Sequence, residues 1–171
     1  MNADKTADST NDSLRVFVYG TLKPGGRYWR RLCAGRVKGC FPAWIQGQLF
    51  DLPVGYPAVV ASEDADAVVH GFVLRFAPAE GEEVLQDLDD LEGYDPTDPE
   101  SPDNEYRRFP CLAYPRELTP EEQAFPKVRA YRMEDAPAAP TQCWAYFMQA
   151  DVAASLRATP IGKPSWNHLE S

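Results

Sequence analysis

The sequence predicts an α+β protein: a small mixed β-barrel with helices packed outside it. Stretches with strand character follow one another without helical crossovers, which indicates a mixed or largely antiparallel sheet. Closing such a sheet wholly or partly into a barrel protects its edges. Only residues 82–91 form a convincing helix. A doubly wound dinucleotide-binding fold needs a helix between successive strands, so the pattern argues against it.

The predicted strands are short apolar, β-branched runs bounded by glycine or proline. The first covers residues 14–19 and is stopped by Gly20. A short extended piece is expected at residues 58–60, directly after Pro57. The residue before this proline also favours extended geometry. The remaining strands are expected at residues 43–51, 67–76, 105–113, 128–133 and 143–149.

The helix over residues 82–91 places its apolar side chains on one face: Val84, Leu85, Leu88 and Leu91. Gly93 suits the left-handed position that ends a helix. A shorter helix is expected within residues 28–34. The segment 94–104 is rich in proline and aspartate and must be a loop, either a lid over a site or a surface excursion.

Length and composition fit one domain with its own core, since the chain has 171 residues of which 44% are hydrophobic. We expect that domain over residues 14–171, preceded by a disordered polar tail over residues 1–13. A formal net charge of −9 argues against a nucleic-acid partner. No apolar run is long enough to span a bilayer, so we expect no membrane association. By elimination, the sequence predicts a cytoplasmic protein.

The cysteines and histidines do not have the spacing of a metal site, and no metal is expected. His70 lies in a strand pattern and reads as a packed, hydrogen-bonded side chain, while His168 is far from it. A nucleophilic triad is therefore disfavoured. Reduced, partly buried thiols are expected for Cys33, Cys40, Cys111 and Cys143.

The turn after the first strand, Tyr19-Gly20-Thr21-Leu22, is the first candidate site. A strand that stops at glycine leaves backbone N–H groups without a ladder partner, and glycine lets a ligand approach the backbone. Such a turn can bind a carboxylate or amide oxygen through its N–H groups. The alternative is an ordinary tight turn after a core strand.

Glu92 is the second candidate, at the end of the predicted helix and just before Gly93. The C-terminal end of a helix is negative, so a carboxylate there is disfavoured, and burial would raise its pKa further. A carboxyl group with a raised pKa suits proton transfer near neutral pH. The alternative is that Glu92 is simply exposed. Most of the acids that surround it must be solvated surface residues, and these acids are Asp87, Asp89, Asp90 and Asp95.

Several segments in the order found here resemble the gamma-glutamylcyclotransferase-like (AIG2-like) family. The match covers roughly residues 15–149, and the ordered set is more specific than any one segment. The segments are VFVYGTL with KPG at 16–25, GYPA at 55–58, LDDLEGY at 88–94, YRR at 106–108 and CWAY at 143–146. The loop at 94–104 is longer than in compact relatives, so the choice of substrate does not carry over.

The resemblance implies a small mixed β-barrel and an enzyme that releases 5-oxoproline from a small-molecule gamma-glutamyl amine, amide or peptide without a cofactor. It implies Glu92 as the catalytic acid and base. The expected substrate-binding residues are Tyr19, Gly20, Thr21, Leu22 and Tyr146. Two alternatives stay open: a non-catalytic module of the same fold that binds a small metabolite, and an enzyme that removes a gamma-glutamyl protecting group from a biosynthetic intermediate.

Overall fold

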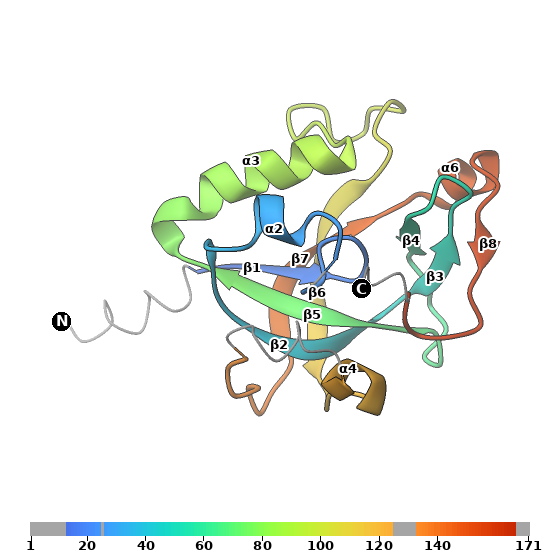
Figure 1. Cartoon of the computed structure of the whole chain (residues 1–171). Helices are drawn as coiled ribbons and strands as arrows, with labels where there is room; N and C mark the ends of the chain where they lie inside the picture. Colours follow the sequence, from blue (N-terminus) through green and yellow to red (C-terminus); the bar gives the residue numbers. More distant parts are fainter. Residues whose placement is uncertain (1–12, 25, 125–132, 167–171) are drawn as a thin grey trace.

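A five-stranded β-barrel forms the centre of the computed structural model, which describes residues 13–24, 26–124 and 133–166 (Figure 1). Most of the predicted tail, residues 1–12, lies outside the described residues. The barrel strands are β1 (Leu14–Val18), β2 (Val37–Gln46), β5 (Val68–Phe76), β6 (Arg107–Pro115) and β7 (Thr141–Phe147).

The barrel closes in the order β1-β5-β2-β6-β7. Every neighbouring pair is antiparallel except β1 and β7, which run parallel where Val16 lies opposite Trp144. The predicted mixed barrel is therefore confirmed. Closure pairs both edges of β1, so the turn that follows Val18 starts from a strand held on two sides.

The side chains of β1 are buried on both faces of the barrel wall, which explains its continuous apolar run. Val16 and Val18 face a core that includes residues of a long helix. Phe17 faces the second core, inside the barrel, with Ile45 and Val73. This two-sided packing fixes the position of the strand end where the candidate turn begins.

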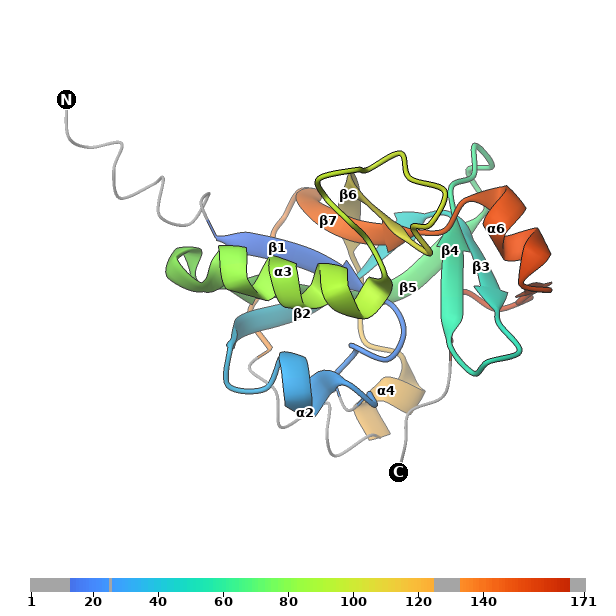
Figure 2. The same ribbon diagram turned by 90° about the horizontal axis from the view of Figure 1, so that it is seen from above.

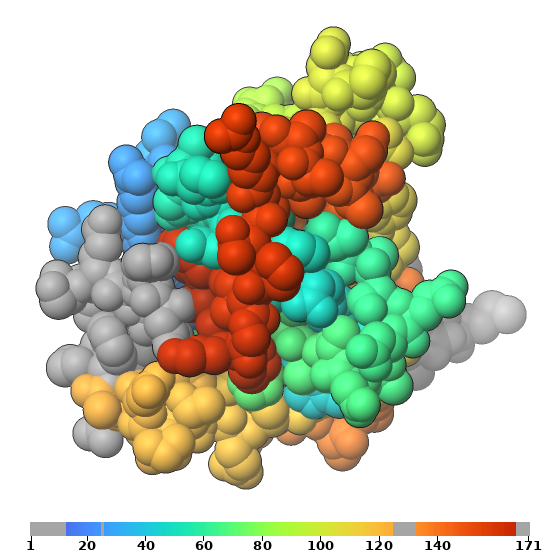
Figure 3. Space-filling view, turned by 90° about the vertical axis from the view of Figure 1, so that its right-hand side faces the viewer, coloured from blue at the N-terminus to red at the C-terminus, as the bar shows by residue number. Residues whose placement is uncertain are grey.

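A second sheet of three strands, in the order β4-β3-β8, lies beside the barrel. Its strands are β3 (Gln48–Asp51), β4 (Pro57–Val60) and β8 (Thr159–Pro160). In Figure 3 the C-terminal segment, in red, crosses the face formed by this sheet and neighbouring segments.

The predicted single strand over residues 43–51 is wrong, because the chain breaks between β2 and β3 at Gly47. A Cβ atom on Gly47 would lie 2.6 Å from Cγ1 of Val59. Only glycine lets the backbone pass this close to β4 while it leaves the barrel for the second sheet. The alternating pattern on either side gives no sign of the change of sheet.

The long helix α3 (Gly81–Glu92) lies across the barrel and confirms the predicted helix with one more residue at each end (Figure 2). It follows the short 3₁₀ turn η1 (Pro78–Glu80). Val84 and Leu88 are buried in the core shared with the barrel. The helix ends at Gly93, whose φ of 65° and ψ of 42° are left-handed, as expected for a terminating glycine.

Three short helices complete the described structure. The predicted helix within residues 28–34 is present as α2 (Trp29–Leu32). The helices α4 (Pro120–Ala124) and α6 (Ala150–Ser155) are not predicted from the sequence, because they are too short to show a clear period. The predicted strand over residues 128–133 lies outside the described residues except for Met133, which forms an isolated bridge with Cys40.

Candidate active site

The two candidate segments of the sequence meet at one cavity of about 130 Å³. The turn after β1 forms one part of its lining, and the end of α3 forms another. All six residues singled out in the sequence line this cavity: Tyr19, Gly20, Thr21, Leu22, Glu92 and Tyr146. The structure thus brings them together, while their roles in binding and catalysis stay predictions.

The turn after β1 lines the cavity with residues whose backbone N–H groups are not used in the fold of the described residues. No acceptor among the described residues binds the N–H groups of Gly20, Thr21 or Leu22. The carbonyls of Gly20 and Thr21 are used, because they accept from the N–H groups of Lys23 at 3.0 Å and Tyr28 at 2.9 Å. A Cβ atom on Gly20 would lie 2.7 Å from Cγ of Pro57, so a side chain there would displace the turn. Such a set of N–H groups can bind an anion or an oxyanion.

Glu92 is the last residue of α3 and is half-buried. Burial in the cavity, the larger cause, and the nearby charge of Glu105, the smaller one, together raise the pKa of its carboxyl group from 4.5 to about 8. The pKa of Glu92 is therefore shifted in the expected direction, and the causes are burial and a neighbouring carboxylate. A carboxyl group with a pKa near neutrality can both accept and donate a proton.

The cavity wall is rich in tyrosine hydroxyls that are held by backbone groups. Tyr19 donates to the carbonyl of Tyr146 at 2.8 Å and accepts from the N–H of Val59 at 3.3 Å. Tyr106 donates to the carbonyl of Pro57 at 2.7 Å. Burial raises the pKa of the Tyr19, Tyr106 and Tyr146 hydroxyls, so they stay neutral at physiological pH.

Asp89 ties the helix to the barrel one turn before Glu92. Arg108 donates to both of its oxygens, from Nε at 2.9 Å and from Nη2 at 3.2 Å. The hydroxyl of Tyr146 donates to Oδ1 of Asp89 at 2.7 Å. The sequence predicts that most of the acids around Glu92 are solvated, and Asp89 is an exception, since only 3% of the residue is exposed. Asp89 therefore holds Tyr146 in the cavity wall and fixes the last turn of α3.

Four further polar residues of the cavity were not singled out as site residues from the sequence: Tyr28, Tyr56, Glu105 and Tyr106. Glu105 lies two residues before the start of β6, and its N–H donates to the carbonyl of Gly93 at 3.1 Å. The hydroxyl of Tyr56 donates to Oε1 of Glu105. The segments with Tyr56 and Tyr106 stand out in the sequence, but nothing in the sequence places them beside Glu92.

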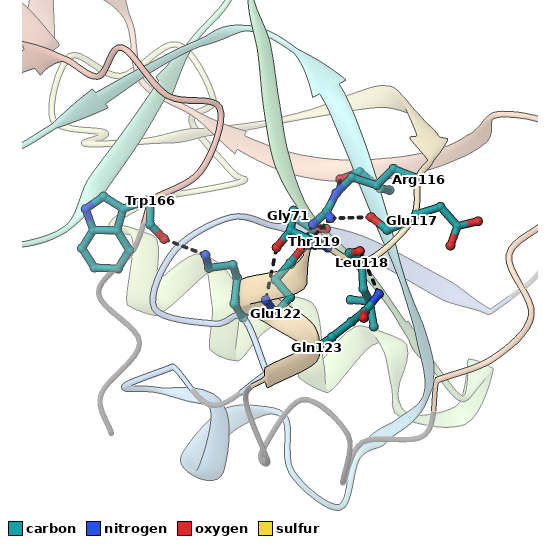
Figure 4. A network of polar contacts seen from close by, with 10 residues as sticks. Gly71, Arg116, Glu117, Leu118, Thr119, Glu122, Gln123 and Trp166 are labelled. Atoms are coloured by element: carbon teal, nitrogen blue, oxygen red, sulfur yellow. Dashed lines mark hydrogen bonds and ion pairs between the residues drawn. The ribbon is translucent and has the colours of Figure 1, made fainter.

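The C-terminal segment is hydrogen-bonded to Lys23, the residue directly after the turn. The buried amine of Lys23 donates to the carbonyl of Trp166 at 2.7 Å, and the indole N–H of Trp166 donates to Asp51 at 3.0 Å. Figure 4 shows the hydrogen bond that the Trp166 carbonyl accepts, together with the polar contacts around Arg116 and Glu122. Burial lowers the pKa of Lys23 to about 8. These bonds tie the turn to the second sheet.

The loop over residues 94–104 is held by its own side chains. Asn104 is buried, accepts from the N–H of Asp95 at 2.9 Å and donates to the carbonyl of Asp98 at 3.0 Å. None of the residues 94–104 is among the described residues that line the cavity. The lid hypothesis therefore finds no support in this conformation of the loop, and it stays a prediction.

The other chemically reactive side chains lie elsewhere. The described residues contain no group of three His, Cys, Asp or Glu side chains placed to hold a metal ion. The four cysteines are free thiols. His70 does not line the cavity, and its Nδ1 has no hydrogen-bond partner within the described part of the chain, contrary to expectation. No helix among the described residues is long and apolar enough to cross a membrane.

Solved structures with the same fold are found in several organisms. An AIG2-like protein from Mus musculus has a TM-score of 0.58 and 18% identity, covering 91% of this chain and 88% of that one. YkqA from Bacillus subtilis has a TM-score of 0.53 and 18% identity over 90% of this chain, which spans only 39% of YkqA. An uncharacterized protein from Pyrococcus horikoshii has a TM-score of 0.51 and 15% identity, covering 92% of both chains.

Similarity in sequence is seen at the level of the family. No curated protein matches the chain in a sequence search. The model of the family described as gamma-glutamyl cyclotransferase, AIG2-like, matches residues 16–168. This range includes every residue that lines the cavity. The chain belongs to the AIG2-like gamma-glutamyl cyclotransferase family.

Proposed function

We propose that this protein is a gamma-glutamyl cyclotransferase that converts a gamma-glutamyl amine, amide or peptide into 5-oxoproline and a free amine. The observation that carries the proposal is the position of Glu92. Its carboxyl group, with a pKa of about 8, lines the same cavity as the unpaired N–H groups of Gly20, Thr21 and Leu22. The family match supports the reaction class.

The reaction is an intramolecular aminolysis. The neutral α-amine of the gamma-glutamyl group attacks the side-chain carbonyl carbon, and a new C–N bond closes the five-membered lactam. Ionised Glu92 takes a proton from the attacking nitrogen and passes it to the departing nitrogen as the original amide bond breaks. One proton thus moves from one nitrogen to the other, and Glu92 returns to its starting state.

The turn after β1 would supply the electrostatic part of catalysis. Its N–H groups would hold the α-carboxylate of the substrate or the oxyanion that develops at the attacked carbonyl. The neutral hydroxyls of Tyr19 and Tyr146 would border the folded substrate. Because amine and carbonyl belong to one molecule, holding them in a bent conformation also removes much of the entropic cost of the reaction.

The test is a screen of gamma-glutamyl amino acids, gamma-glutamyl amines and glutathione, with 5-oxoproline as the measured product. We expect 5-oxoproline from at least one class, with equimolar release of its amine. Tight binding of such compounds without any release of 5-oxoproline would instead favour a binding module of the same fold. A binding module does not need a carboxyl group with a raised pKa in the cavity, which is why the enzyme is preferred.

A further inference from the structure

The cavity has an excess of negative charge, which is carried mainly by Glu105 at pH 7 because the raised pKa of Glu92 keeps most of that carboxyl group protonated. Two carboxyl groups line it, from Glu92 and Glu105, and none of its described lining residues is basic. A gamma-glutamyl group brings one ammonium and one carboxylate, so it does not by itself correct the imbalance. A ligand with an additional positive charge would do so.

Glu105 differs from the carboxylates that pair with an arginine. It forms no ion pair with a basic side chain among the described residues. Its defined partner is neutral, the hydroxyl of Tyr56. The carboxylates that do have an arginine partner are Asp87, Asp89, Glu100, Glu122 and Glu134.

Glu105 also lies toward the outer part of the cavity. The tyrosines of the inner wall are buried, with exposed fractions of 7% for Tyr19 and 3% for Tyr146. Glu105 and its partner Tyr56 are only half-buried, as is Tyr28. With its carboxylate on the N–H groups of the turn after β1, one of the two arrangements in the proposed function, the gamma-glutamyl group would leave the departing amine to extend toward this half-buried part of the wall.

We propose that Glu105, oriented by Tyr56, binds a second ammonium group on the departing amine and so selects gamma-glutamyl derivatives of diamines and other cationic amines. The inference rests on the proposed function. A carboxylate held by one neutral donor has acceptor capacity left for a charge-assisted hydrogen bond. A departing amine that carries a carboxylate would be repelled by the same group, as the cysteinylglycine part of glutathione would be.

The test uses three gamma-glutamyl compounds of similar length whose departing amines differ in charge at the far end. These amines are 1,5-diaminopentane (cationic), pentylamine (neutral) and 5-aminopentanoate (anionic). We expect kcat/KM to fall in that order, by roughly tenfold from the cationic to the neutral compound, as for one charge-assisted contact. Glu105→Gln should bring the three values together, and Glu83→Gln, on the exposed face of α3, should leave the order unchanged.

The outcomes separate the subsite from the proposed function. Equal kcat/KM for the three compounds in the wild-type protein would overturn the subsite and leave the cyclotransferase standing. An equal loss on all three compounds in Glu105→Gln would overturn it too, because Glu105 would then hold the α-ammonium that they share. If none of the three compounds, and no compound of the wider screen, releases 5-oxoproline, the proposed function fails and the subsite falls with it.

Discussion

The raised pKa of Glu92 makes activity depend on pH in a way that a single substitution can shift. With a pKa of about 8, about one tenth of Glu92 is ionised at pH 7 and about nine tenths at pH 9. Ionised Glu92 is the proton acceptor, so kcat/KM should rise as pH increases through this range. Glu105 is the second cause of the raised pKa, after burial. Glu105→Gln should therefore lower the pKa of Glu92.

The size of this change follows from the loss of one neighbouring negative charge. Such a charge typically changes a pKa by roughly one pH unit or more. Lowering the pKa of Glu92 from about 8 to about 7 would raise its ionised fraction at pH 7 roughly fivefold. Burial remains as the first cause, so the pKa should stay above the ordinary value of 4.5. The ratio of variant to wild-type kcat/KM should be greatest near pH 7 and level off above about pH 9.

The assay is the pH profile of 5-oxoproline release from gamma-glutamylpentylamine, whose departing amine carries no charge for Glu105 to bind. Titration of the substrate's own α-amine cancels in the ratio between variant and wild type. Glu83→Gln serves as the matched control, because it removes a charge from an exposed position on α3. A wild-type profile that is flat between pH 6 and 9, or a Glu105→Gln limb that moves to higher pH, would refute the reasoning.

Three further predictions concern stability and geometry. Asp89→Asn should lower the free energy of unfolding in urea by about 3–5 kcal/mol, because it leaves the largely buried Arg108 without its charged partner. The control Asp90→Asn, at an exposed position, should have little effect. Gly20→Ala should lower kcat/KM by up to about a hundredfold, because its Cβ would meet a proline at 2.7 Å, while Gly162→Ala, with nothing within 4 Å of its Cβ, should be neutral. The pKa of Glu92 is raised on folding, so its ionisation opposes folding. Glu92→Gln should match the wild type in urea unfolding at pH 4 and exceed it at pH 9 by at most about 5 kcal/mol.

The parts of the fold that were predicted correctly have a clear local pattern. The apolar run of β1 and the 3.6-residue period of α3 each reflect burial that neighbouring residues in the chain share. The break at Gly47 was missed because the apolar pattern continues through it. What decides the break is the approach of Val59, twelve residues later, and no local pattern records it.

The site could be predicted only in part, again because some of its residues are brought together by contacts that leave no local pattern in the sequence. Glu92 and the turn at Gly20 can be found from segment ends and from the family resemblance. Periodicity could not separate Asp89, in helix α3, from the acidic residues around it. Its burial depends on the ion pair with Arg108, which lies in strand β6. Glu105 joins the site only because the loop after Gly93 returns to the end of α3, and the sequence gives no sign of that return.

The central claim is that Glu92 moves the proton between the two nitrogens, and Glu92→Gln tests it most directly. The substitution keeps the size of the side chain and removes its acid–base function. With the best gamma-glutamyl substrate of the screen, we expect turnover to 5-oxoproline to fall by about a hundred- to ten-thousand-fold, while the variant stays folded with an undiminished melting temperature and still binds substrate. A folded Glu92→Gln variant with near-normal turnover would contradict the account and remove Glu92 from the mechanism.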